Sequence, residues 1–202
     1  MRPSPLKAAL RAAALTLTLA VAAPLSAAVT PSPAHAMGQT QTQTYSDNEV
    51  LDAGHRFFGS ASTGLASLVE QAFARYGQPN GYVLGEEGSG AFVGGLRYGE
   101  GVLFTKNAGD HKVYWQGPSV GWDFGGDGNR TMMLVYNLDQ VDKIYRRYIG
   151  VSGQAYLIGG LGMTVMRHGD TVLVPVRTGV GARLGVNVGY LKMRDRPTWN
   201  PF

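Results

Sequence analysis

The sequence predicts an α+β protein that is mainly β: a small antiparallel β-barrel of about eight strands, with two N-terminal helices and one inserted helix. Three observations predict this fold. Apolar residues repeat at helical spacing within residues 46–76, the repeat changes to two residues after Gly77, and most of the 29 glycines separate the short alternating runs that follow. Glycine supplies the sharp bends that closure of a sheet requires, and closure removes exposed edges, so we expect a barrel rather than an open sheet.

Residues 1–36 have the pattern of a secretory signal peptide. The basic residues Arg2, Lys7 and Arg11 precede an uncharged apolar run at Ala12–Ala23, and the sequence AHA at Ala34–Ala36 fits a small-x-small cleavage site. The apolar run is shorter than the roughly 20 residues that span a bilayer. We therefore expect an exported protein whose signal peptide is cleaved after Ala36 or, alternatively, after Ala28.

The charge and cysteine content exclude several classes of protein. The chain has 18 Lys and Arg residues against 14 Asp and Glu residues, but three of the basic residues lie within residues 1–36. The remaining chain is close to neutral, so we expect no nucleic-acid partner. The sequence contains no cysteine, which excludes a disulfide framework, a thiolate zinc site, a cysteine nucleophile and lipidation at a processed N-terminal cysteine.

The helical segment follows a short leader. Residues 37–45 are polar and lack periodicity, which is typical of a flexible leader. An N-terminal helical segment is predicted at 46–76, packed on the barrel. Ser46 and Glu49 fit a capping box at the start of its first helix, and Gly59 is placed to end that helix.

A second helix is predicted after the turn GSASTG. Its apolar residues repeat at helical spacing from Leu65 to Tyr76, and Gly77 followed by Pro79 is a typical C-terminal stop. Each of these two helices has one apolar face, which we expect to pack on the barrel.

Residues 77–196 are predicted to form the glycine-rich barrel, and residues 197–202 a C-terminal tail. A helix is predicted at 139–149, because four apolar residues would share one face, with acidic residues in the first turn and basic residues in the last. The predicted strands are Tyr82–Leu84, Ala91–Tyr98, Val102–Lys106, Val113–Gln116, Thr131–Asn137, Ala155–Arg167, Thr171–Arg177 and Ala182–Met193.

The sequence carries no motif for nucleotide binding or catalysis. The runs GSGAFVGG and GVGARLG have the wrong spacing for a dinucleotide fingerprint, and neither a phosphate loop nor a GxSxG elbow occurs. His55 has no second metal ligand at helical spacing, while His111 and His168 lie in predicted turns. Adjacent Glu86 and Glu87 would point to opposite faces of a strand. We expect no catalytic residue, metal, nucleotide or other cofactor.

The stretch WQGPSVGWDFGGDGNR, residues 115–130, is the best candidate for a binding site. Its tryptophans offer flat contact surfaces, and its glycines let backbone N–H groups approach an anionic or sugar group. The predicted binding residues are Trp115, Ser119, Trp122, Asp123, Asp127 and Arg130.

A structural interpretation of the same stretch stays open. Both tryptophans could cap the barrel core, while Asp123, Asp127 and Arg130 form a turn held by side-chain hydrogen bonds. The sequence DFGGDGN lacks the alternating oxygen ligands and closing glutamate of a calcium loop, so a metal site is not expected.

Three longer runs carry a family resemblance: GSGAFVGGLRYGEGVLFTK, VYWQGPSVGWDFGGDGNRTMMLVYN and IGVSGQAYLIGGLGMTV. Over about Asp47 to Met193 the chain resembles the envelope integrity protein A family of exported Gram-negative proteins, a domain of unknown function. This resemblance implies a small periplasmic β-barrel with N-terminal helices, a role in keeping the cell envelope intact, and no known activity. The run WQGPSVGWDFGGDG is also similar to SYLF-type lipid-binding modules, although here Pro118 precedes Ser119.

Together these observations predict a non-enzymatic periplasmic protein that binds an envelope lipid, glycan or protein and is peripheral to the membrane at most. Two alternatives stay open. One is a hydrolase or transferase acting on envelope polymers, which would need a perturbed carboxylate or histidine in a cleft. The other is a structural adaptor without a small ligand.

Overall fold

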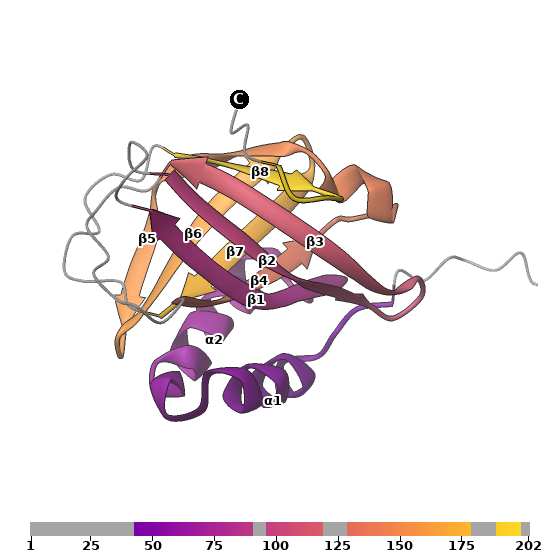
Figure 1. The fold of residues 1–202 in the computed structure, drawn as a ribbon. Coiled ribbons are helices and arrows are strands. Elements are labelled where there is room, and N and C mark those ends of the chain that lie inside the picture. Colours follow the sequence, from indigo (N-terminus) through magenta and orange to yellow (C-terminus); the bar gives the residue numbers. More distant parts are fainter. Residues whose placement is uncertain (1–42, 91–95, 119–128, 179–188, 199–202) are drawn as a thin grey trace, which may run out of the picture. The chain divides into compact units, whose positions relative to one another are not determined.

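A computed structural model describes residues 43–90, 96–118, 129–178 and 189–198 (Figure 1). Eight antiparallel strands close into a barrel in the order β1-β2-β3-β8-β5-β6-β7-β4, which confirms the predicted fold class. The strands are β1 (Gly81–Gly90), β2 (Leu96–Thr105), β3 (Gly109–Pro118), β4 (Asn129–Tyr136), β5 (Arg147–Ile158), β6 (Leu161–His168), β7 (Thr171–Arg177) and β8 (Tyr190–Arg194). The helices are α1 (Asp47–Phe58), α2 (Leu65–Tyr76) and the 3-10 helices η1 (Gly59–Ser62) and η2 (Val141–Ile144).

The two N-terminal helices begin and end as their sequences predict. The hydroxyl of Ser46 accepts from the N–H of Glu49, and the Glu49 carboxylate accepts from the N–H of Ser46, which completes the capping box. Gly59 and Gly77 follow the two helices with positive φ angles of 59° and 73°, which glycine adopts without steric cost. No helix in the described part of the chain has the length and hydropathy needed to cross a membrane.

Strands β4 and β7 are buried on both faces. In β4, Met132, Leu134 and Tyr136 belong to a cluster that includes the apolar faces of α1 and α2. The alternate residues Met133 and Val135 belong to a second cluster inside the barrel. The continuous apolar runs TMMLVY and TVLVP follow from this arrangement, because the helices cover the outer face of strands whose inner face is already buried. Figure 1 shows both helices on the same side of the barrel.

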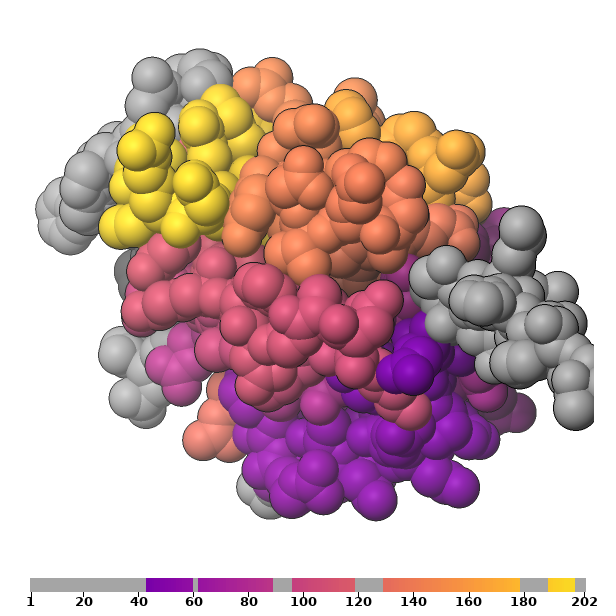
Figure 2. All heavy atoms as spheres, turned by 90° about the vertical axis from the view of Figure 1, so that its right-hand side faces the viewer, coloured from indigo at the N-terminus to yellow at the C-terminus, as the bar shows by residue number. Residues whose placement is uncertain are grey.

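One end of the barrel is closed by the segment around η2. Figure 2 views this end, where the orange segment lies beside β8 in yellow and β2 and β3 in pink. Leu138, Ile144 and Tyr148 from this segment are buried and complete the inner cluster.

The helix predicted at 139–149 is wrong. The structure has only one 3-10 turn at Val141–Ile144, and β5 already begins at Arg147. The apolar residues at helical spacing fill the barrel end instead. Tyr148 reaches the interior from a strand, because β5 pairs with β8 through Tyr148 and Leu191.

Two further strand predictions are also wrong: one divides a single strand in two, and the other merges two strands into one. The predicted strands Ala91–Tyr98 and Val102–Lys106 are joined in one strand, β2, which spans Leu96–Thr105, while residues 91–95 of the first lie outside the described ranges. The predicted strand Ala155–Arg167 is a hairpin of β5 and β6, whose turn has Gly159 and Gly160 at φ angles of 57° and 78°. Of the predicted strand Ala182–Met193, residues 182–188 lie outside the described ranges.

Candidate functional site

Trp115 lies inside the barrel wall, where strand glycines make room for its ring. Its side chain is 2% exposed. A Cβ atom at Gly99, its cross-strand partner, would lie 2.2 Å from Cε2 of the indole, and a Cβ at Gly85 would lie 2.7 Å from Cη2. Glycine inside a strand normally weakens it, and here its reason is the close approach of an aromatic ring.

The indole directs its N–H toward a buried carboxylate. Trp115 Nε1 donates to Glu87 Oε2 at 2.8 Å. The same carboxylate pairs with two arginines: Arg177 Nε lies 3.3 Å from Oε1, and Arg97 Nη1 lies 3.7 Å from Oε1. Glu87 is 6% exposed, whereas its neighbour Glu86 is exposed, so the two carboxylates point to opposite faces of β1 as predicted. We refer to Glu87, Arg97, Trp115 and Arg177 as the Glu87 cluster.

The cluster keeps its carboxylate ionised. Burial by itself would raise the pKa of Glu87, but the guanidinium groups of Arg177 and Arg97 and the N–H of Trp115 outweigh burial and hold the pKa below its ordinary value. Two guanidinium groups therefore lie beside one carboxylate in a region of low dielectric, where charges interact strongly.

Arg177 and its neighbour Thr131 have polar atoms that are buried without partners. Arg177 is 8% exposed, and its Nη2 atom has no hydrogen-bond partner within the described part of the chain. The same holds for Oγ1 of Thr131, which is fully buried and is the cross-strand partner of Arg177. A buried donor without a partner costs about 1 to 3 kcal/mol and more when it is charged, so these two atoms mark a position where a ligand group or water belongs.

An apolar, solvent-accessible residue, Leu157, lies on the same side of the sheet as Arg177. Leu157 pairs with Gly162, and Gly162 pairs with Arg177, so the three positions face the same side of the sheet. Leu157 is nevertheless 42% exposed. The barrel interior beside Arg177 thus offers both a cation and an aliphatic surface in contact with solvent. Arg177 pairs with Thr131 near the start of β4, whereas η2 follows the end of β4, so this site lies at the barrel end opposite to η2.

A hollow reaches the Glu87 cluster from the outer side of β1, β2 and β3. Gly88 and Gly99 carry no side chains there, so both Glu87 and Trp115 line it. The remainder is lined by Gln116, two tyrosines, the carboxylates Glu86 and Glu100, and the C-terminal segment, with Arg194 and Arg196 as its cations.

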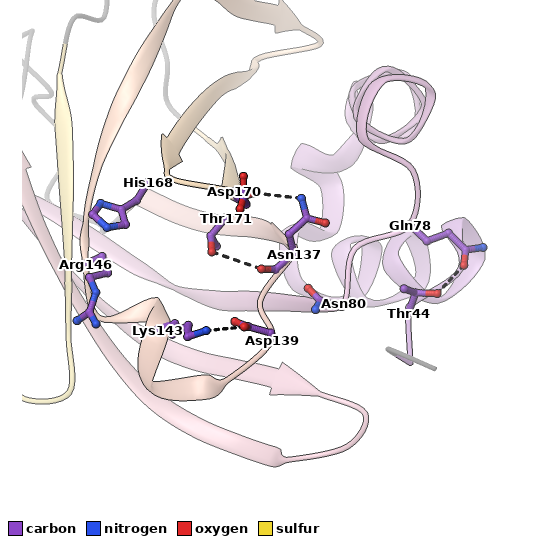
Figure 3. A pocket seen from close by; sticks show the side chains of 10 residues that line it. All are labelled: Thr44, Gln78, Asn80, Asn137, Asp139, Lys143, Arg146, His168, Asp170 and Thr171. Carbon is purple, nitrogen blue, oxygen red and sulfur yellow. Dashed lines mark hydrogen bonds and ion pairs between the residues drawn. The ribbon is translucent and has the colours of Figure 1, made fainter. Parts of the chain in front are cut away.

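The polar hollow at the η2 end has a different character (Figure 3). Asn137 Nδ2 donates to the carbonyl of Asp170 at 3.0 Å, Thr171 Oγ1 donates to the carbonyl of Asn137 at 3.4 Å, and Lys143 pairs with Asp139. These groups pair with one another and hold the connections between strands together. The Glu87 cluster, with its unpaired donor, is therefore the better candidate for a ligand site.

The structure separates the two predicted site residues that it describes. Trp115 faces the interior, whereas Arg130 pairs with the exposed Glu86 position across β1 and β4 and faces outward. Arg130 Nη1 donates to the carbonyl of Phe57 at 2.9 Å, so it contacts the end of α1. The other predicted binding residues, Ser119, Trp122, Asp123 and Asp127, lie outside the described residues.

Sequence reasoning did not find Glu87, Arg97, Arg177 and Thr131 as a group. Arg177 and Glu87 are 90 residues apart, and only the closure of β1 onto β4 and β7 brings them together. A weak signal was present, because Glu87 lies in phase with the inward residues Val83 and Gly85 and is therefore a charge on the apolar side of its strand.

Within the described ranges, no group of three or more histidine, aspartate or glutamate side chains could hold a metal ion.

Residues 43–202 match the family described as envelope integrity protein A. No curated protein matches the chain. Among solved structures, the chain is similar to a β-barrel-like, uncharacterized protein from Brucella abortus. The two are 64% identical with a TM-score of 0.73, and the match covers 79% of this chain and 99% of that chain.

Proposed function

This chain belongs to the envelope integrity protein A family, and from that premise we propose that it is a non-enzymatic periplasmic protein that supports the cell envelope by binding an envelope component. The family name supports a role in envelope integrity, and the signal peptide predicted at residues 1–36 supports export. We further propose that the bound component carries an anionic group, a carboxylate or a phosphate, which the Glu87 cluster recognises.

One observation carries this proposal: the buried Nη2 atom of Arg177 has no hydrogen-bond partner among the residues that the structure describes. Arginine presents its donors in a planar fork that matches a carboxylate or phosphate, and Nε of the same group already contacts Glu87. A monoanion placed beside Nη2 would satisfy this buried donor. The hydroxyl of Thr131 can donate to the same anion.

The electrostatics of Glu87 favour binding over catalysis. A general acid in glycan cleavage needs a raised pKa, so that its proton is present at neutral pH. The pKa of Glu87 is lowered by the two guanidinium groups, and the nearest second carboxylate in sequence, Glu86, lies on the other face of the strand. Glu87 is therefore suited to stay ionised and to orient the two arginines. An enzyme acting on envelope polymers is the less favoured alternative.

Trp115 provides the test. Its indole N–H donates to Glu87, so its NMR resonance reports on the cluster directly. We expect titration with decanoate or inorganic phosphate to shift this resonance saturably, and mass spectrometry of protein purified from the periplasm to detect a co-purifying anionic lipid or glycan. The two probes distinguish a carboxylate ligand from a phosphate ligand.

Thr131→Val is the matched variant, because it keeps the side-chain shape and removes a hydroxyl that has no hydrogen-bond partner in the described part of the barrel. It should leave unfolding unchanged or slightly stabilise the protein, and it should weaken the titration. Arg167→Gln removes a positive charge from the exposed end of β6 and should leave the titration unchanged. An indole resonance that neither probe shifts, with no co-purifying ligand, would favour a structural adaptor.

A further inference from the structure

The exported chain is close to neutral, but its charged side chains are unevenly distributed around the barrel. Arg146, Arg147, Lys192 and Arg194 line one hollow on the outside of β5 and β8, together with Asp195. We call these four cations the basic face. In Figure 2, β8 in yellow lies beside the orange segment that leads into β5.

Strand pairing places several of these side chains on one continuous surface. Arg147 is the cross-strand partner of Lys192, and Ile149 is the cross-strand partner of Tyr190. The alternate residues of both strands are buried in the inner cluster, so these four side chains face outward.

Cations outnumber carboxylates in the hollow of the basic face, because Asp195 is its one acidic residue, among those that the structure describes, beside the four cations. No ion pair formed within the described ranges includes Arg146, Arg147 or Arg194. The pKa of Lys192 is lowered, first by partial desolvation and then by the positive charges of Arg194 and Arg147. The cations therefore repel one another, and an anionic partner would relieve that repulsion.

An exposed aliphatic side chain lies next to these cations. Ile149 is 60% exposed, which is unusual for an isoleucine on a strand. Arg167 is its partner on β6, and Tyr190 is its partner on β8. The Arg147 guanidinium lies 4.7 Å from the centroid of the Tyr190 ring, so a cation and an amphipathic aromatic residue are held together beside Ile149.

We propose that the basic face, together with Ile149, docks on the surface of an anionic lipid membrane. Arginine and lysine side chains contact the phosphates of anionic lipids, while exposed aliphatic and tyrosine side chains enter the interfacial layer. A soluble polyanion would match the cations but would leave Ile149 in water. This surface lies outside the barrel, so the inference goes beyond the interior ligand site and does not depend on it.

Vesicle sedimentation tests the proposal. The purified chain should sediment with vesicles of phosphatidylglycerol and phosphatidylcholine, and should stay in solution with vesicles of phosphatidylcholine alone. Binding should weaken as salt rises, because screening shortens the reach of the cations. The double variant Arg147→Gln with Lys192→Gln should lower the partition coefficient about 25-fold, since each basic residue near the surface contributes about fivefold.

Two further variants make the result specific. Ile149→Ser should weaken binding to the anionic vesicles while leaving its salt dependence unchanged, because only the apolar contact is lost. The double variant Arg56→Gln with Arg75→Gln removes the same charge from exposed positions on α1 and α2 and should bind like the unaltered chain. If both double variants lost vesicle binding equally, net charge alone would explain the binding, and the proposal would be overturned. Absence of binding to the anionic vesicles would also overturn it, as would binding to soluble dextran sulfate without vesicle binding.

Discussion

Trp115 and Gly99 are cross-strand partners on β3 and β2, and the indole ring fills the space that a side chain at residue 99 would occupy. A Cβ atom there would lie 2.2 to 2.4 Å from three atoms of a rigid ring that is also hydrogen-bonded to Glu87. The ring cannot move aside without breaking that hydrogen bond. The glycine at position 99 is therefore required by packing.

Gly99→Ala should consequently lower the free energy of unfolding by about 1 to 3 kcal/mol or more, the range expected for overpacking. Gly88→Ala is the matched control, because a Cβ at this exposed strand position would meet nothing within 4 Å. Its effect should stay within about 0.5 kcal/mol. Urea denaturation followed by far-UV circular dichroism measures both. Equal stabilities would show that Trp115 can leave its position freely.

The sequence was sufficient for the architecture because the relevant signals are local. The capping box at Ser46 and Glu49, the stops at Gly59 and Gly77, and the alternation along the strands depend only on neighbouring residues. The helix predicted at 139–149 failed because pairing of Tyr148 with Leu191 is a long-range contact that overrides local periodicity.

The candidate site was harder to predict for the same reason. Glu87 was recognised as a residue facing away from Glu86, but its two arginines come from β2 and from β7. Arg177 ends a strand that is apolar on both faces, so alternation does not reveal the side on which it lies. Only the register of the closed barrel places its guanidinium beside Glu87.

Glu87→Gln should be strongly destabilising at neutral pH. It leaves the buried guanidinium of Arg177 and the half-buried guanidinium of Arg97 without their carboxylate, and breaking a buried ion pair typically costs about 3 to 5 kcal/mol. Glu86→Gln changes an exposed carboxylate on the same strand and serves as the control, with little expected effect. Chemical denaturation at pH 7 compares the two, and equal losses would contradict the assigned role of Glu87.

The lowered pKa of Glu87 also predicts how the stability difference between the unaltered chain and Glu87→Gln depends on pH. A carboxylate whose pKa is lower in the folded state stabilises the fold above its unfolded pKa, with an ordinary value of 4.5, and loses this contribution as the pH falls through the folded pKa. The difference in stability between the unaltered chain and Glu87→Gln should therefore be largest above pH 4.5 and shrink below it. A difference that grew on acidification would contradict this assignment.

Deletion of residues 46–76 should cause aggregation. The helices cover the outer face of β4, β6 and β7, where Met132, Leu134 and Val174 are fully buried. Each such side chain contributes roughly 1.5 to 3 kcal/mol when it is removed from water, and the exposed patch would become a surface for association. Size-exclusion chromatography coupled to light scattering measures the outcome. A monomeric deletion variant would show that the barrel does not need the helices.

Ser46→Ala tests the helical segment more gently. It removes the acceptor for the Glu49 N–H and should cost about 1 kcal/mol of unfolding free energy, with the chain remaining monomeric. Asn48→Ala, in the first turn of α1 next to the cap, should have less effect, because the hydrogen bond at this residue uses its backbone N–H. Thermal unfolding of the two variants side by side would show whether the cap contributes as expected.

Arg130 separates a structural role from a role in recognition. Its guanidinium donates to the Phe57 carbonyl and lies 6.0 Å from the Phe57 ring centroid, but the residue is exposed, so Arg130→Ala should lower the unfolding free energy by no more than about 1 kcal/mol. If Arg130 belongs to the predicted recognition stretch, this folded variant should nevertheless fail to restore a strain that lacks the protein under envelope stress. Arg130→Lys keeps the charge but loses the planar fork, so partial restoration by this variant would indicate a partner recognised mainly by charge. Stability and complementation are to be measured on the same variants. Full restoration by Arg130→Ala would leave Arg130 as a contact that holds the end of α1 against β4.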